Sequence, residues 1–339
     1  MMENKVLSVS IAGYNVEPTL RETLEPFLCT GVLDKLDVMI VDDGSKDGTA
    51  KVAQEFVDKY PNTFRLIKKE NGGWGSTVNS GIDHAYGKYF KQLDGDDYYR
   101  PENMAAFIHC LENTDADMVI TQYISYNDQT GEQMSFENCN PGCESGKVYQ
   151  MSEVPSFTPF MHSLCVKTEL LKKGNVKVTE KCFYTDTEFV LKAVNQVQTV
   201  MFYDEVIYCY RRAAAGQSMS LNGFEKHYLE QYKVIQVLLQ YKKEHVKRKE
   251  IIAMYDQMLF GTCMWHYLVM LYIAPTRQHK KDLVEYDQML KALAPDYYNR
   301  VDVGTIQKLR KVHFLGYRFA ATYKKKKDNR FTADGRMLY

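Results

Sequence analysis

The sequence lacks three features that would each point to a large class of proteins. It has no excess of charge, because 43 lysines and arginines balance 43 aspartates and glutamates among 339 residues, and a balanced charge gives no reason to expect a nucleic-acid partner. No apolar run approaches the ~18 residues that a membrane-spanning helix needs. Residues 1–5 do not resemble a secretory signal peptide. We therefore expect a globular, cytoplasmic protein that binds no nucleic acid.

Two common nucleotide-binding signatures are also missing. The glycine-rich stretch 71–81 contains no Gly-x-Lys-Ser/Thr, so a Walker-type phosphate loop is not expected. The dinucleotide fingerprint Gly-x-Gly-x-x-Gly is absent after the first predicted strand, where the sequence reads Ala12-Gly13-Tyr14-Asn15. A nucleotide, if one is bound, must be held by other residues.

The cysteines show no framework of disulfides or metal ligands. All eight are scattered along the chain, and only Cys139 and Cys143 are close together. No histidine or further cysteine stands near this pair at ligand spacing, so two loop thiols are favoured over a zinc site. This usage is typical of reduced thiols in a cytoplasmic protein.

Strand and helix patterns alternate through the first 125 residues. We predict strands at 7–12, 38–41, 64–67, 89–93 and from 118, and helices at 17–28, 49–60, 76–86 and 101–111. Repeated strand–helix units are typical of a mostly parallel sheet covered on both faces. The sequence therefore predicts the α/β class.

The rest of the chain changes character twice. Residues 125–155 are polar and predict a surface excursion, followed by helices at 167–173 and 186–195 and a pair of strands within 199–210. After Gly216, helical periodicity runs through 224–272 and again through 280–293. We predict two regions, a domain at 1–216 and a helical region at 217–339.

Three carboxylates follow the predicted strand at 89–93. Asp94, Asp96 and Asp97 lie within four residues, and they repel one another unless a cation compensates their charge. Asp94 or Asp96 could ligate Mg²⁺ or Mn²⁺, with diphosphate oxygens and water as the remaining ligands. The alternative is an acidic turn before the helix that begins at Pro101.

Two further acidic segments carry candidate chemistry. Asp42 and Asp43 end an apolar run, where a carboxylate can accept N–H hydrogen bonds from a nucleobase, although a surface turn with a helix cap is equally compatible. Asp186 stands at the start of a predicted helix, where it is either an N-cap or a catalytic base. Between these acids, the glycines around Trp74 suggest a loop whose backbone approaches a ligand.

Taken in order, these segments resemble the family 2 glycosyltransferases, which are inverting enzymes of the GT-A fold, here of the bacterial cell-surface polysaccharide type. The resemblance covers about residues 5–220. The matching pieces are residues 8–15, 41–45, 71–81 with 87–90, 93–97 with Pro101, and Thr185-Asp186.

The resemblance implies a role for each matching residue. Asp186 matches the catalytic base, and Asp96, with Asp94 beside it, matches the ligands of a divalent cation, Mn²⁺ or Mg²⁺. His162 and Glu188 lie where the acceptor cleft is expected, although a plainly packed histidine is an equal alternative for His162. The residues expected to bind the donor are Tyr14, Asn15, Asp42, Asp43, Asn71, Gly72, Trp74, Asn79, Asp94, Arg211 and Ser218.

The chain departs from the family pattern at one point and lacks one signature. The family often has Glu-Asp where this chain has Thr185-Asp186, so the base is kept and a neighbouring acid is lost. The Gln-x-x-Arg-Trp signature of processive members is absent, which favours transfer of a single sugar.

The activity that the resemblance implies is metal-dependent, inverting transfer of one sugar. The donor is expected to be a UDP-sugar, and the acceptor a hydroxyl of a glycan or lipid-linked molecule in cell-envelope or exopolysaccharide synthesis. Two alternatives remain open. A sugar nucleotidyltransferase should show a basic, glycine-rich loop after the first strand, and a non-catalytic carbohydrate-binding or scaffold protein would not need all three acidic sites.

The C-terminal region is locally basic. Residues 306–319 mix apolar and basic side chains at helical spacing, and Lys324 to Lys327 follow without interruption. Such a helix can lie on an anionic membrane surface, here the inner face of the cell membrane. The alternative is a helix docked on its own protein, with a solvated basic tail.

Overall fold

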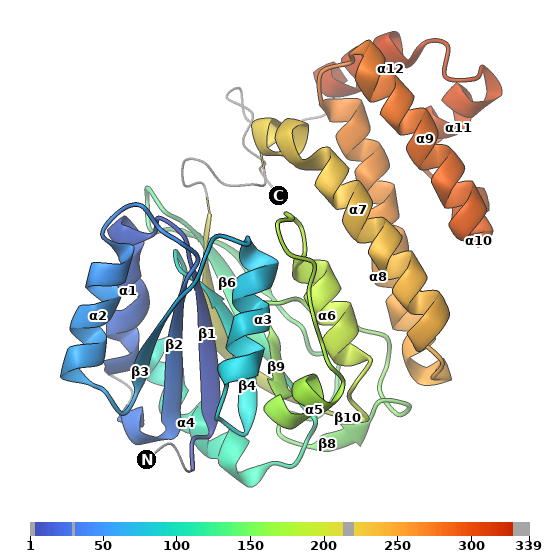
Figure 1. Ribbon diagram of the computed structural model, residues 1–339. Helices are drawn as coiled ribbons and strands as arrows, with labels where there is room; N and C mark the ends of the chain where they lie inside the picture. The colour runs from blue at the N-terminus through green and yellow to red at the C-terminus, as the bar shows by residue number, and fades with distance from the viewer. Residues whose placement is uncertain (1–3, 29–30, 213–219, 328–339) are drawn as a thin grey trace. The chain divides into compact units, whose positions relative to one another are not determined.

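The computed structural model describes residues 4–28, 31–212 and 220–327. The chain divides into two compact units, Met1–Ala214 and Ala215–Tyr339. The first contains the sheet and the second is helical (Figure 1). None of the helices in the described ranges combines the length and hydrophobicity needed to cross a bilayer.

The first unit begins with the predicted strand–helix alternation. Its elements are β1 (Leu7–Gly13), α1 (Glu17–Leu28), a short 3₁₀ turn (Leu33–Lys35), β2 (Leu36–Asp42), α2 (Thr49–Lys59), β3 (Phe64–Lys68), α3 (Trp74–His84), β4 (Tyr89–Asp94), β5 (Tyr98–Tyr99) and α4 (Pro101–Asn113). The strands β3, β2, β1 and β4 are parallel neighbours. Because β1 and β2 are buried along nearly their whole length, their apolar runs form the core.

Beyond β4 the sheet becomes mixed. The full order is β3-β2-β1-β4-β9-β6-β10-β5. The strand β9 (Leu164–Lys167) runs antiparallel to β4 and to β6 (Met118–Asn127), while β10 (Thr199–Arg212) runs parallel to β6. Helix α3 packs on β1 and β2, and α4 packs on β10. The predicted α/β class is confirmed, with a sheet that is parallel in its first half and mixed beyond it.

Several local predictions need correction. The region 125–155 contains β7 (Gln133–Glu137), which pairs with β6, and β8 (Val148–Gln150), which pairs with β10. These strands are largely exposed, so no apolar pattern marks them. The predicted strand pair within 199–210 is the single strand β10, whose register shifts around Val206. The predicted helices correspond to α5 (Thr168–Lys173) and α6 (Asp186–Val194).

The second unit is built from helices joined by short turns. They are α7 (Leu221–His245), α8 (Lys249–Tyr272), α9 (Arg277–Leu293), α10 (Pro295–Arg300), α11 (Gly304–Lys311) and α12 (Tyr317–Lys327). The helical periodicity predicted through 224–272 is confirmed as two helices, which are separated because Val246 and Arg248 have extended backbones between α7 and α8. The Thr276 hydroxyl accepts a hydrogen bond from the His279 N–H and caps α9.

The predicted helix at 306–319 is also broken. His313, Phe314 and Gly316 have positive φ angles of 47°, 58° and 144°, which no helix can accommodate. Phe314 is buried and anchors the turn between α11 and α12. The four lysines 324–327 belong to the last turn of α12 and are not a tail beyond a helix.

Candidate functional site

The predicted site residues converge on one edge of the sheet. Because β1, β2 and β4 run parallel, their carboxyl ends meet there, and ligands of α/β proteins bind beyond such ends. Asn15, Asp43 and Asp96 stand in the three loops that follow these strands.

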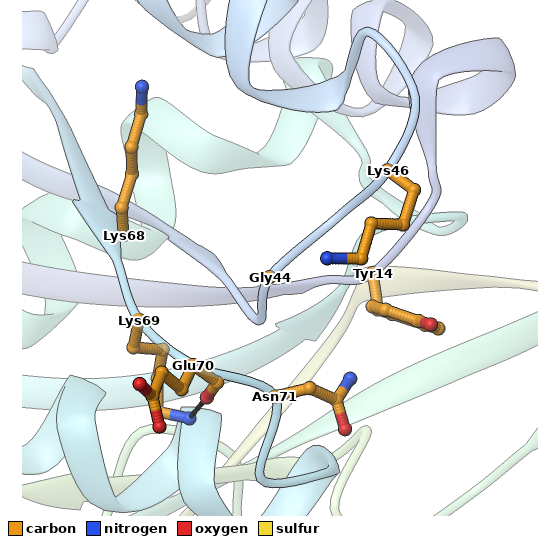
Figure 2. A pocket seen from close by; sticks show the side chains of 7 residues that line it. All are labelled: Tyr14, Gly44, Lys46, Lys68, Lys69, Glu70 and Asn71. Atoms are coloured by element: carbon orange, nitrogen blue, oxygen red, sulfur yellow. Dashed lines mark hydrogen bonds between the residues drawn. The ribbon is translucent and has the colours of Figure 1, made fainter.

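A pocket of about 490 Å³ opens at this edge. Figure 2 shows its lining residues, which come from the loops after β1 and β2 and from the end of β3 onward: Tyr14, Gly44, Lys46, Lys68, Lys69, Glu70 and Asn71. The Tyr14 side chain is half exposed and free to pack against a planar group. The volume lies in the range of ligand-binding pockets.

Asp43 organises the wall of this pocket. Its carboxylate accepts hydrogen bonds from Lys69 Nζ at 2.7 Å and from the N–H groups of Gly72 and Gly73 at 2.9 and 2.7 Å. The Asn71 amide donates to the Asp43 carbonyl at 3.0 Å. Both carboxylate oxygens therefore already hold the glycine-rich loop, and the predicted base contact through Asp43 stays a prediction.

Asn15 and Asp42 join the first two loops. Asn15 Oδ1 accepts from the Lys46 N–H at 2.8 Å, and Ser45 Oγ accepts from the Asn15 N–H at 3.0 Å. Asp42 Oδ1 accepts from the Ser45 N–H at 3.0 Å. These bonds fix the loop carrying Lys46 beside Tyr14, so Asn15 and Asp42 shape the pocket wall without lining it.

The glycine-rich loop leads into α3 and links two parts of the site. Trp74, the first residue of α3, donates from Nε1 to Asp94 Oδ1 at 2.7 Å. The Gly72 carbonyl accepts from the Lys181 N–H at 2.5 Å. A Cβ at Gly75 would come within 2.2 Å of the Thr179 carbonyl oxygen, so only glycine allows this approach. The loop therefore touches both the acidic turn and the segment that precedes Asp186.

Asn79 is a positioning residue in this structure. Its amide nitrogen donates to the Val178 carbonyl at 2.9 Å, and its amide oxygen accepts from the Val178 N–H at 2.8 Å. The side chain is buried and ties α3 to the segment before α6. Both amide atoms are used inside the protein, and the predicted donor contact through Asn79 stays a prediction.

The acidic turn after β4 holds three carboxyl groups whose charges disfavour one another. Burial, together with the neighbouring charges of Asp96 and Asp186, raises the pKa of Asp94 to about 7. Burial also raises the pKa of Asp96, and burial with the charges of Asp96 and Asp94 raises that of Asp97. Because the charge of Asp186 contributes to the raised pKa of Asp94, the first residue of α6 lies near this edge.

Asp97 was missed as a site residue, although it belongs to the acidic motif. Its carboxylate accepts from the Tyr208 hydroxyl at 2.5 Å and from the Arg211 N–H at 2.7 Å. The Tyr208 hydroxyl in turn accepts from the Asp94 N–H at 3.3 Å. Asp97 thus fastens the acidic turn to β10, and it leaves Asp94 and Asp96 at the surface of the site.

Arg211 braces the acidic turn from behind. Its guanidinium donates to the Asp96 carbonyl at 2.6 Å and forms ion pairs with Glu22 at 2.6 Å and Asp128 at 2.5 Å. These three bonds hold the guanidinium against the acidic turn, and the predicted donor contact through Arg211 stays a prediction. Among the described residues, no side chain donates a hydrogen bond to the Asp96 carboxylate itself.

Asp186 begins α6 and is exposed to solvent. Burial by the surrounding protein nevertheless raises the pKa of its carboxyl group, because burial disfavours the charged form. The preceding Thr185 is buried, and its hydroxyl has no hydrogen-bond partner in the described ranges.

The two predicted acceptor residues are both packed into the protein. Glu188 is fully buried, pairs with Lys192 at 2.7 Å and accepts from the Thr179 N–H at 3.1 Å. This carboxylate links α6 to the segment at 178–181, and the predicted acceptor contact through Glu188 stays a prediction.

His162 fits the alternative of a packed histidine. Its ring lies 5.0 Å from that of Tyr123, 4.8 Å from that of Tyr208 and 4.6 Å from that of Tyr210. Burial and the nearby Lys91 lower its pKa to about 3, so the ring is neutral. Ser218, the remaining predicted donor contact, lies outside the described residues.

No complete metal cage is preformed in the part of the chain that the structure describes, where no group of three or more His, Cys, Asp or Glu side chains could hold an ion. Mg²⁺ is usually bound through only one or two carboxylates plus substrate phosphates. Asp94 and Asp96 supply such a pair, and Asp96 has a carboxylate with no side-chain donor, so these residues fit a cation that arrives with a diphosphate. The described cysteines, Cys139 and Cys143 included, are free thiols.

Sequence relatives point to one family. Residues 8–168 match the model of glycosyl transferase family 2. The chain is 33% identical over 133 residues to the putative glycosyltransferase EpsH of Bacillus subtilis, covering 39% of this chain and 38% of that protein. It is 26% identical over 216 residues to the uncharacterized glycosyltransferase EpsJ of B. subtilis, covering 61% of each.

A third relative is longer than this chain. The minor teichoic acid biosynthesis protein GgaB of B. subtilis is 28% identical over 221 residues, which cover 63% of this chain and 24% of GgaB. In each of these three relatives, the matched region spans less than two thirds of the protein's own length.

Solved structures share the fold. S. aureus TarS 1-349, crystallised in complex with UDP-GlcNAc, matches with a TM-score of 0.68 at 16% identity, over 96% of this chain and 94% of that one. The mannosyltransferase PcManGT from Pyrobaculum calidifontis, in complex with GDP-Man and Mn²⁺, matches with a TM-score of 0.52 at 16% identity, over 97% and 89% of the two chains. With the family match and the acidic strand ends in place, residues 8–168 are assigned to glycosyl transferase family 2.

Proposed function

We propose that the chain is a metal-dependent, inverting glycosyltransferase that moves one sugar from a UDP-sugar to a hydroxyl of a glycan or lipid-linked acceptor in cell-envelope polysaccharide synthesis. Catalysis belongs to the domain at 1–216. The observation that carries the proposal is the meeting of Asp94, Asp96 and Asp186 at one sheet edge, beside a pocket walled by Tyr14 and Asn71.

The pocket supports the donor half of the proposal. Tyr14 offers a ring for a nucleobase to stack on, and Asn71 and Lys46 offer polar atoms on either side. A uridine nucleotide is preferred because TarS, which shares the fold, was crystallised with UDP-GlcNAc and with UDP. The GDP-Man complex of PcManGT makes a guanosine donor the competing choice.

The acidic turn supports the proposed dependence on a divalent cation. Asp96, with Asp94 beside it, would hold Mn²⁺ or Mg²⁺ together with the donor diphosphate. The bound cation would neutralise charge that develops on the departing nucleoside diphosphate. Arg211 and Asp97 keep the turn rigid, so little reorganisation is required when the donor binds.

Asp186 is the proposed base. A carboxylate that water reaches, but whose pKa the protein raises, is suited to accept a proton from an acceptor hydroxyl. The hydroxyl then attacks the anomeric carbon from the face opposite the diphosphate, through a transition state resembling an oxocarbenium ion, and one displacement inverts the configuration. Trp74 holds Asp94 in place through the hydrogen bond that its indole N–H donates.

The proposed acceptor rests on the name of one relative, and the proposed location rests on the cysteines. GgaB is named for teichoic acid biosynthesis, which fits an acceptor in the cell envelope. Free thiols at all the described cysteines fit a reducing compartment. We therefore place the reaction in the cytoplasm, at the inner face of the cell membrane.

The test is nucleotide release from a panel of nucleotide sugars with Mn²⁺ or Mg²⁺. We expect UDP to be released from one donor only when metal is present, and release to be lost in Asp96→Ala but kept in Asp58→Ala, which alters an exposed acid on α2. Release of pyrophosphate in place of UDP would identify a nucleotidyltransferase. Failure of every nucleoside diphosphate to bind in the presence of metal would overturn the proposal.

A further inference from the structure

Large apolar side chains are exposed in the turn between α11 and α12 and along α12. Val312, Leu315, Phe319 and Tyr323 are 48%, 68%, 79% and 53% exposed. They recur every three or four residues, and the rings of Phe319 and Tyr323 stack with centroids 6.4 Å apart. Single exposed apolar residues are ordinary, but a contiguous row marks an interaction site.

This row is not the face that packs α11 and α12 onto their own unit. Ile306, Leu309, Phe314, Tyr317 and Ala321 are the buried residues of these helices and the turn between them. Helix α12 packs on α8, where the Tyr317 hydroxyl donates to the Met270 carbonyl at 2.6 Å. The segment is thus docked through one face and presents a second apolar face to solvent.

The exposed row lies in a strongly basic segment. Residues 304–327 contain eight lysines and arginines and no aspartate or glutamate, although the whole chain has no net charge. Arg310 is used inside the unit, where it pairs with Asp287 at 2.7 Å. Lys311, Arg318, Lys325, Lys326 and Lys327 are exposed around the apolar row.

We propose that Val312, Leu315, Phe319 and Tyr323, with the lysines and arginine around them, form a docking surface for an anionic lipid bilayer. The apolar side chains would enter the boundary between headgroups and acyl chains, while the cations stay at the level of the lipid phosphates. The complete absence of acids matches a negative surface. A soluble polyanion would bind to the lysines alone and would leave the apolar row exposed to water.

This surface deepens the proposed function, on which its biological purpose rests, because a lipid-linked acceptor is presented at a membrane. It differs from the predicted helix at 306–319, since the break at 312–316 redistributes the exposed residues over a turn and a second helix. Binding itself can be measured without any enzymatic turnover.

The test is co-sedimentation of the full chain with vesicles of phosphatidylcholine, with and without about 30% phosphatidylglycerol, a fraction chosen near that of anionic membranes. We expect binding only to the anionic vesicles, with an affinity that falls as salt is raised. Replacing Lys325, Lys326 and Lys327 together by glutamine should weaken binding roughly a hundredfold. The variant Leu315→Ser/Phe319→Ser should weaken it at least about tenfold.

Matched controls use the same substitutions elsewhere. Leu229→Ser changes a side chain that is 52% exposed on α7, and Lys280→Gln/Lys281→Gln removes charges on α9; both should bind vesicles as the unaltered chain does. Circular dichroism melting checks that each variant is folded.

Three outcomes would overturn the inference. They are equal binding to neutral and anionic vesicles, no binding to either, and a loss caused by the lysine changes that the Leu315→Ser/Phe319→Ser variant does not share. The last would identify a soluble polyanion as the ligand. UDP release from the donor is measured without vesicles. Failure of the docking surface is therefore distinguishable from failure of the proposed function.

Discussion

The two units use their acids in opposite ways. In the helical unit both buried aspartates have donors: Asp282 accepts from the Tyr228 hydroxyl at 2.6 Å, and Asp287 accepts from the Tyr267 hydroxyl at 2.6 Å and from Arg310. In the sheet unit, Asp94, Asp96 and Asp186 crowd one edge, and no lysine or arginine among the described residues forms an ion pair with any of them.

The difference separates acids that stabilise the fold through hydrogen bonds and ion pairs from acids that the fold keeps at one edge without a cationic partner. A buried carboxylate paired with a phenol or guanidinium satisfies both groups and joins two helices. Burial, together with the neighbouring acids Asp96 and Asp186, disfavours the charged form of Asp94 and raises its pKa to about 7. Asp43 and Asp97, which are fully hydrogen-bonded, show that the sheet unit also contains acids of the first kind.

The largest expected effect comes from changing one acid of the reactive edge. Asp186→Asn keeps the shape of the side chain and removes the proposed base, so turnover should fall by roughly 10²–10⁴-fold, as for the loss of a general base. Stability against urea should not fall, because an ionised carboxyl group in unfavourable surroundings has been removed. Turnover with a matched acceptor and urea unfolding are measured on the same preparation. Unchanged turnover would remove Asp186 from the mechanism.

In the helical unit, removing a buried acid is expected to lower stability. Asp287→Ala leaves the Arg310 guanidinium and the Tyr267 hydroxyl without their shared acceptor, which should lower the free energy of unfolding of that unit by about 3 kcal/mol. Asp296→Ala, at an exposed acid of α10, is the control and should change it by less than about 0.5 kcal/mol. Urea unfolding followed by tyrosine fluorescence provides the measurement. An equal loss in both variants would contradict the role assigned to Asp287.

The smallest expected effect is a pH dependence of stability. Because the folded pKa of Asp94 is raised above its unfolded value, the folded state holds a proton that the unfolded state releases, and stability should fall as pH rises from about 4 to about 7. This single group contributes a slope of at most about 1.4 kcal/mol per pH unit.

Asp94→Asn should flatten that slope, whereas Asp58→Asn, at an exposed acid of α2, should leave it in place. Urea midpoints without metal or nucleotide, taken between pH 5 and pH 7, give the comparison. A slope of the same size in the Asp94→Asn variant would mean that another group is responsible.

The sequence predicted the elements better than it predicted the use of individual side chains. The helix at 17–28 and the strands near 7–12, 64–67 and 89–93 agree with the structure, because their apolar patterns are strictly local. The exposed strands β7 and β8 were missed, since they bury too little surface to impose such a pattern. The break in 306–319 was missed because Phe314 packs inward from a turn.

Within the site, the sequence identified the acidic edge, but it could not distinguish binding residues from positioning residues. Three polar residues in or near the family motifs form hydrogen bonds or ion pairs inside the protein. They are Asn79, Arg211 and Glu188. Their partners Val178, Asp128 and Lys192 include residues far along the chain. A motif gives the residue type at a position, whereas the side chain's partner depends on packing.

What the sequence alone determined is the alternation of strands and helices and the placing of Asp43, Asp94 and Asp96 at strand ends, because both follow from local periodicity and from the direction of parallel strands. Only the tertiary structure decided which acids remain available. That outcome depends on contacts between distant segments. Asp97 accepts hydrogen bonds from Tyr208 and Arg211 of β10, and Asp43 accepts them from the glycine-rich loop. Asp94, Asp96 and Asp186 therefore remain for the proposed donor and acceptor.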